Sequence, residues 1–150
     1  MSTTNGTNGT NGTNTTSVTA FDALVNSAID IRDALNGNVQ QLNLAIEYEA
    51  AKRRTAKELR ASYEEAEAEF VAEVMPNLTG KNAESRKAEL DAALVAARRD
   101  GPLAAKWVQM NAAAYDAEDA KVGLDTCAKT YHATEAAANL TAAILNAVAK

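Results

Sequence analysis

The chain has 150 residues, a formal net charge of −5, one cysteine and one histidine. The negative charge excludes a general attraction to nucleic-acid phosphates or to anionic lipid surfaces. Cys127 has no disulfide partner, and Cys127 and His132 together cannot complete a zinc site, so we expect no metal and no cofactor.

Much of the 47% hydrophobic content is alanine, whose methyl group contributes less than about 1 kcal/mol on burial. The core of a monomer should therefore be thin. Alanine-lined helices can approach one another closely and have high intrinsic helicity. This composition favours a slender hairpin or a homo-oligomer over a compact globule.

The first 17 residues are almost entirely Ser, Thr, Asn and Gly, with a tandem Asn-Gly-Thr repeat from position 5 to 13. A segment with nothing apolar to bury cannot offset the entropy lost on ordering. We therefore predict a disordered tail over residues 1–17 and one helical domain over residues 18–150. The tail could be a tether or a repeat expansion without a structural role.

Beyond the tail, apolar residues recur at spacings of three and four, which predicts helices and no strand. The four predicted helices cover residues 19–35, 38–75, 83–99 and 102–149. We expect the two long helices to pack antiparallel, with the two shorter ones packed on them. The predicted fold class is all-α, an elongated helical hairpin or bundle.

Four positions set the predicted helix ends. Asn36-Gly37 is the expected stop of the first helix, and Pro76 ends the second because proline lacks an amide hydrogen. Asn82 is the expected N-cap of the third helix. Pro102 should open the fourth helix, which we expect to continue through Gly123 because one interior glycine costs only about 1 kcal/mol.

The second helix carries a weak coiled-coil pattern, apolar at both ends and charged in the middle. The two expected heptad positions are Val39, Ile46, Arg53, Arg60, Glu67 and Val74, and Leu42, Glu49, Ala56, Tyr63 and Phe70.

The segment between the second and third helices is the most distinctive stretch. Gly80, Lys81, Asn82 and Arg86 surround a helix N-terminus whose amides could hold an anion weakly. A phosphate-binding P-loop is absent, and the charge of Glu84 opposes a bound anion. The alternative, which we favour, is a purely structural turn between the helices.

The string G-K-N-A-E-S-R-K at residues 80–87 follows a Glu- and Ala-rich helix, and the element Ala117-Glu118 lies in the helix beyond. This arrangement resembles a group of small, uncharacterised helical proteins from tailed bacteriophages and prophages, over about residues 45–145. Ser85 stands where the related strings usually have a second Glu. Members often lie near recombination and replication genes, which implies a nucleic-acid-processing context but no catalytic residue.

Arg53, Lys57 and Arg60 share one stripe of the second helix and could contact nucleic-acid phosphates, with a nearby tyrosine stacking on a base. However, Glu49 and Glu64 lie four residues from Arg53 and Arg60. Ordinary pairs within the helix can account for much of this charge, so a solvated helix face is the favoured interpretation.

Trp107, Met110 and Tyr115 cluster near the start of the fourth helix. Packing of these side chains against the other helices is the favoured role. A contact site for a partner protein is the alternative, since Trp and Tyr dominate such sites.

No residue pattern indicates catalysis. A di-iron bundle needs Glu-x-x-His pairs, but position 129, three before His132, is lysine. Cys127 and His132 are five residues apart and face different sides of a helix, which excludes a nucleophile–base pair within that helix. We expect a protein that is not an enzyme.

The N-terminus lacks the pattern of a secretory signal, and the longest uncharged run, residues 136–149, is too short to span a bilayer. We expect no membrane contact and a cytoplasmic location, in the host cell if the protein is phage-encoded. The predicted function is protein–protein interaction or self-association. The alternatives are an accessory nucleic-acid-binding protein of phage recombination or replication, and a virion or assembly component.

Overall fold

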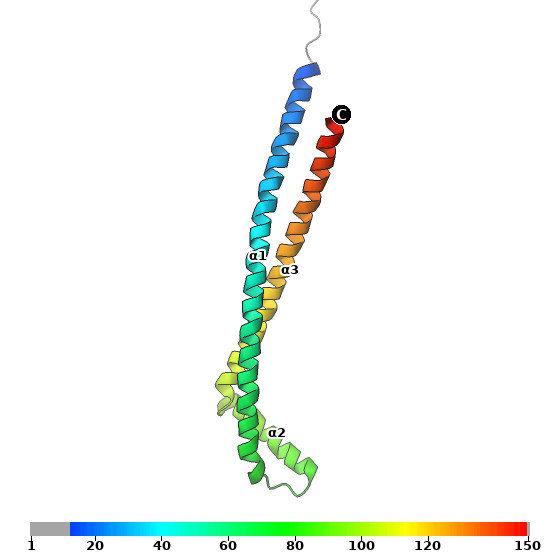
Figure 1. The fold of residues 1–150 in the computed structure, drawn as a ribbon. Coiled ribbons are helices and arrows are strands. Elements are labelled where there is room, and N and C mark those ends of the chain that lie inside the picture. Colours follow the sequence, from blue (N-terminus) through cyan, green and yellow to red (C-terminus); the bar gives the residue numbers. More distant parts are fainter. Residues whose placement is uncertain (1–12, 150) are drawn as a thin grey trace, which may run out of the picture. The chain divides into compact units, whose positions relative to one another are not determined.

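The computed structural model describes residues 13–149, which form helices and no strand, so the all-α prediction is confirmed. The elements are α1 (Thr13–Val74), the short 3-10 helix η1 (Met75–Asn77), α2 (Ala83–Asp100) and α3 (Ala104–Val148) (Figure 1). They divide between two compact units. Over the described residues, unit 1 comprises residues 13–42 and 127–149, and unit 2 is Asn43–Thr126.

Helix α1 is one helix where the sequence predicted two, so the stop at Asn36-Gly37 is wrong. Gly37 has no positive φ, and a Cβ added there would meet no atom within 4 Å. One interior glycine costs about 1 kcal/mol, which the packing of the residues on either side outweighs. The helix also begins at Thr13, inside the predicted tail; the rest of that tail, residues 1–12, lies outside the described residues.

The other breaks follow the sequence closely. Helix α1 ends at Val74, and Pro76 lies in η1. Asn82 caps α2, with reciprocal side-chain hydrogen bonds between Asn82 and Ser85. Helix α3 runs through Gly123 without a break, as predicted, but it begins at Ala104, two residues after Pro102.

Unit 1 is an antiparallel pair formed by the first part of α1 and the last part of α3. Every third or fourth residue of each helix is half-buried in the seam between them. These seam residues are Leu24, Ala28, Ile31, Leu35, Asn38 and Leu42 of α1, and Cys127, Tyr131, Thr134, Ala138, Thr141 and Leu145 of α3. Asn38 Nδ2 donates a hydrogen bond to Thr134 Oγ1 at 2.8 Å, a part-buried polar contact of the kind that sets register in coiled coils.

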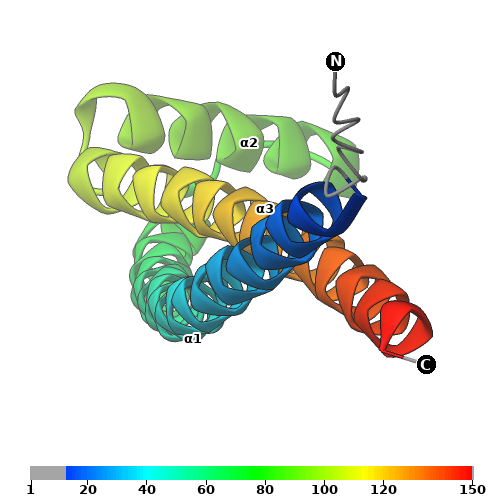
Figure 2. The same ribbon diagram turned by 90° about the horizontal axis from the view of Figure 1, so that it is seen from above.

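Unit 2 contains the core of the described chain. Helix α2 lies beside the first turns of α3 (Figure 2), and both pack on the second part of α1. Tyr63 of α1, Ala97 of α2 and Leu103, which immediately precedes α3, are 3%, 4% and 2% exposed. Partly buried side chains surround them, namely Ala66, Phe70, Leu94, Trp107 and Met110.

The seam of α1 differs by one residue from the predicted heptad. The position containing Leu42, Glu49, Ala56, Tyr63 and Phe70 is buried or half-buried as expected. At the other predicted position only Glu67 and Val74 are half-buried, and the four residues before them are exposed. Their neighbours in the chain are half-buried instead, namely Asn38, Ala45, Lys52 and Leu59. Val39 and Ile46 remain 39% and 48% exposed.

Candidate interaction surfaces

A groove in unit 2, here called the basic groove, brings together several predicted site residues. It has a volume of about 650 Å³ and is lined by Arg53, Ala56, Lys57, Arg60, Tyr63, Glu64, Glu67, Arg98, Trp107, Met110, Ala114 and Ala117. The predicted stripe of Arg53, Lys57 and Arg60 thus lies beside Trp107 and Met110. Tyr115 does not line the groove and is 77% exposed, so the structure separates it from the other two aromatic-cluster candidates.

The charges on the rim of the basic groove are largely paired within α1. Arg53 lies 2.5 Å from Glu49, and Arg60 lies 2.8 Å from Glu64. The hydrogen bond from Arg60 to Glu64 raises the pKa of the Arg60 guanidinium. Lys57 makes no ion pair with any residue of the described chain. It is therefore the cation most available to an anionic ligand.

Arg98 lines the basic groove and contacts three other side chains that line it. Its Nε donates to Tyr63 Oη at 2.6 Å, its Nη2 donates to Glu67, and its guanidinium lies 4.9 Å from the centre of the Trp107 ring. Tyr63 and Trp107 pack at a ring-centre distance of 5.3 Å. Burial raises the pKa of Tyr63. One face of Trp107 is thus occupied by Arg98, which leaves less of the ring for stacking on a base.

Nothing in the sequence indicates this Arg98 contact. Arg98 is notable there only as a cation in the last turn of a helix, where it complements the helix dipole. Its partners Glu67 and Tyr63 are 31 and 35 residues away in the sequence. Helical spacing relates residues three or four apart and therefore cannot reveal such a contact.

The turn between α1 and α2 uses the groups that an anion would need. The Glu89 carboxylate accepts from the backbone amides of Thr79 and Gly80 at 2.9 and 3.2 Å, and the first of these hydrogen bonds lowers the pKa of Glu89. Asn82 Oδ1 accepts from the Ser85 amide at 2.7 Å. Arg86 Nε donates to the Gly80 carbonyl at 2.8 Å. These contacts favour the structural turn over an anion site.

Gly80 is required at this turn by close packing. A Cβ at this position would lie 2.5 Å from Ser85 Oγ and 2.7 Å from the Arg86 nitrogen, both closer than real Cβ contacts. Lys81, the remaining candidate of the turn, is exposed. The structure therefore brings Gly80, Asn82 and Arg86 together and leaves Lys81 at the surface.

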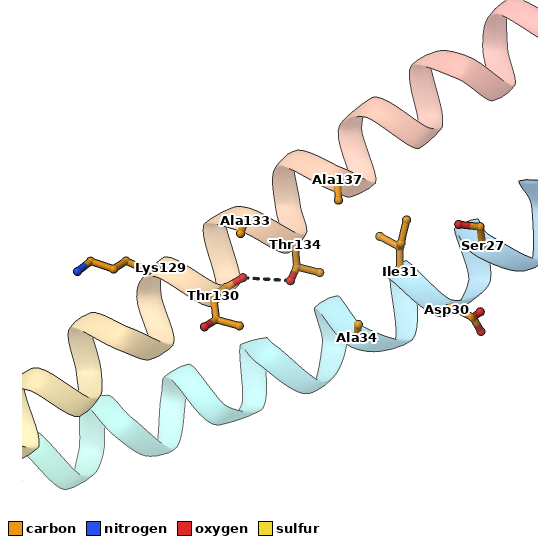
Figure 3. Close-up of a pocket in the computed structure, with 9 residues that line it drawn as sticks. All are labelled: Ser27, Asp30, Ile31, Ala34, Lys129, Thr130, Ala133, Thr134 and Ala137. Carbon is orange, nitrogen blue, oxygen red and sulfur yellow. Dashed lines mark hydrogen bonds between the residues drawn. The ribbon is translucent and has the colours of Figure 1, made fainter.

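Unit 1 carries a second groove, here called the unit 1 groove, which sequence reasoning missed. It is lined by Ser27, Asp30, Ile31 and Ala34 of α1 and by Lys129, Thr130, Ala133, Thr134 and Ala137 of α3 (Figure 3). Most of these side chains are small. The signal for it in the sequence is the recurrence of small residues next to seam positions, as at Ser27, Ala34, Ala133 and Ala137.

Large apolar side chains of unit 1 stay exposed beside this groove and elsewhere on the pair. They are Phe21, Ile29, Val39, Leu140, Ile144 and Val148. Charged residues are sparse there: residues 20–42 and 127–149 contain six, namely Asp22, Asp30, Arg32, Asp33, Lys129 and Glu135. No residue in these two ranges is fully buried.

The described residues contain neither a cluster that could bind a metal ion nor a helix that could span a membrane. Within residues 13–149, no group of three or more His, Cys, Asp or Glu side chains could hold a metal ion. None of the described helices combines the length and apolar character that a bilayer span requires.

Comparisons with known proteins gave no relative for this chain. It matches no protein-family model, and neither the curated proteins nor the solved structures contain a match.

Proposed function

We propose that this protein is a non-enzymatic helical interaction protein that acts through self-association, in the phage-type setting that the string at residues 80–87 suggests. The observation that carries the proposal is the incomplete burial of apolar side chains in unit 1. Its two helices, over residues 20–42 and 127–149, leave no side chain fully buried and expose large apolar residues.

A two-helix pair buries only one stripe of each helix, so most of its surface must face water or another helix. Fully burying a large apolar side chain contributes roughly 1.5–3 kcal/mol, and half-buried seam residues gain only part of this. Additional helices packed on unit 1 would supply the remaining burial. Protein–protein interfaces are depleted of charged residues at their cores, and unit 1 has few charges.

The ionisable groups whose pKa is clearly shifted all have structural partners, which supports a non-enzymatic role. The groups with a clear pKa shift are Lys52, Arg60, Tyr63, Glu89 and Arg98. Each one contacts a side chain or backbone group that also holds a helix or the turn in place. His132, the one histidine, lies on an exposed helix face 3.4 Å from Glu135.

Sedimentation equilibrium on the full chain, over a wide range of protein concentration, tests the proposal. We expect a mass that rises with concentration toward a dimer or a higher oligomer. A mass that stays at the monomer value at every concentration would overturn self-association.

A second candidate function is binding of single-stranded nucleic acid in the basic groove. The observation in its favour is the position of Arg53, Lys57 and Arg60 along the same groove as Trp107. The pairing of Arg53 and Arg60 with glutamates weighs against it. In a fluorescence anisotropy titration at two salt concentrations, Lys57→Ala should weaken binding most per substitution, and no binding by the wild type at low salt ends the idea.

The third interpretation, a virion or assembly component, depends on the Asn-Gly-Thr repeat. Most of that repeat lies outside the described residues, so no contact supports it. It predicts that the protein is present in purified phage particles.

A further inference from the structure

We infer that a second copy of this chain docks on the unit 1 groove, with the α3 helices of the two copies packed antiparallel about a two-fold axis at Ala137. This inference rests on the proposed self-association and assigns the surface that carries it. The contact on α3 is the row Thr130, Ala133, Ala137, Leu140 and Ile144, here called the α3 stripe.

The residues of the α3 stripe form one continuous row along the helix. Its members are spaced three, four, three and four residues apart, so they lie on one face of the helix. The first three line the unit 1 groove, as Figure 3 shows. The last two continue the same face toward the C-terminus and are 64% and 41% exposed. The stripe contains no charged residue.

The side chains of the α3 stripe are complementary in size to those of the same stripe on a second, antiparallel copy. When two copies cross antiparallel at Ala137, Ala133 of each copy faces Leu140 of the other. Thr130 likewise faces Ile144, and the two Ala137 methyl groups meet at the axis. Each large side chain therefore meets a smaller one, as close packing requires, and the contact is the self-complementary kind that a two-fold dimer needs.

The α1 side of the groove permits the same approach. Ser27 and Ala34 are small, and Gly37 lies on the same face, where a methyl group added to it would meet no atom within 4 Å. Small residues let helices pack at the short end of the usual separation of about 8–10 Å. Asp30 is the one charged residue of α1 that lines the groove; it lies one turn before Ala34, and its carboxylate points away from α3 (Figure 3).

The area available matches what a stable dimer needs. Residues 20–42 and 127–149 give a helix pair roughly 35 Å long, and two helices side by side present a face roughly 18 Å wide. Burying that face on both copies removes on the order of 1,200 Å² from water, which reaches the lower end of stable, specific interfaces. The exposed Leu140 and Ile144 place large apolar surface inside this area.

Cysteine cross-linking of the full chain tests the geometry. With Cys127→Ser as the background, A137C puts a thiol on the proposed two-fold axis, where the two copies approach most closely. We expect rapid disulfide-linked dimer under mild oxidation. The control is N139C, at an exposed position that helix geometry places roughly 135° around α3 from the stripe. Equal rates of cross-linking for the two variants would overturn the inference.

A charge placed on the axis provides a second measurement. We expect A137K to raise the dimer dissociation constant by at least about tenfold, because the axis brings two lysines together in an apolar contact. N139K, on the far side of α3, should leave it within about threefold. If the wild type self-associates and A137K behaves like N139K, another surface mediates the contact and this inference fails while the proposed function stands. A monomeric wild type defeats the proposed function itself.

Discussion

Units 1 and 2 use the same two long helices but reach very different degrees of burial. In unit 2, α2 adds a third layer, and Tyr63, Ala97 and Leu103 become fully buried. In unit 1, residues 20–42 and 127–149 contain no fully buried side chain. The large buried side chains Tyr63 and Leu103 thus lie in the cluster to which α2 contributes, whereas the buried residues within α3 are the alanines Ala113 and Ala120.

The charges follow the same division. Residues 43–126 contain 28 of the 35 charged residues, and several of these link different helices, as Lys52 and Asp116 do at 2.7 Å. Within the described residues of unit 1, Asn38 and Thr134 form a side-chain hydrogen bond between the two helices. Both units expose large apolar side chains. Those of unit 1 lie among far fewer charges, which is the composition of a contact surface.

The largest expected difference between the units is in the cost of removing a core leucine. Leu103→Ala should destabilise the protein by about 3 kcal/mol, because Leu103 is 2% exposed and leaves a cavity. Leu35→Ala in the half-buried seam of unit 1 should cost about 1 kcal/mol, since its site is already open to water. Urea unfolding followed by circular dichroism at one protein concentration compares them. Equal costs would show that unit 1 is as well packed as unit 2.

Arg98 tests whether the contacts between helices in unit 2 contribute to stability. Arg98→Ala removes the contacts with Glu67, Tyr63 and Trp107 and should cost about 1–2 kcal/mol, because these groups are partly buried. Arg99→Ala is the matched control: its side chain is 76% exposed and pairs only with its neighbour Asp100, so the cost should stay under about 0.5 kcal/mol. Similar unfolding free energies for the two variants would argue against a structural role for Arg98.

The sequence predicted the helices better than their packing. Local signals identified Pro76, the Asn82 cap and the continuous α3, because proline geometry and capping act over a few residues. The Asn36-Gly37 stop failed because helix packing on both sides outweighs the local preference of one glycine. The seam was misplaced by one residue over part of one heptad position, since apolar size favoured Val39 and Ile46 over their half-buried neighbours Asn38 and Ala45.

The candidate sites were predictable only where they depend on one helix. Arg53, Lys57 and Arg60 do line one groove, because residues three and four apart share a helix face. The approach of Arg98 to Trp107 depends on how α2 returns to α1 and α3, which no spacing within one helix encodes. Tyr115 is separated from Trp107 and Met110 because its position along α3 carries it to another face of the helix.

Two glycines, one in each unit, should give modest effects of opposite sign. Gly37→Ala should stabilise the protein by about 0.5–1 kcal/mol, because alanine is the better helix former and its methyl group would meet no atom within 4 Å. Gly80→Ala should destabilise it by about 1–2 kcal/mol, since its methyl group would lie 2.5 Å from Ser85 Oγ and 2.7 Å from the Arg86 nitrogen. Thermal unfolding of both variants gives the signs directly. A loss of stability in Gly37→Ala would mean that unit 1 needs the open space at this position, as it would if a second copy approached closest there.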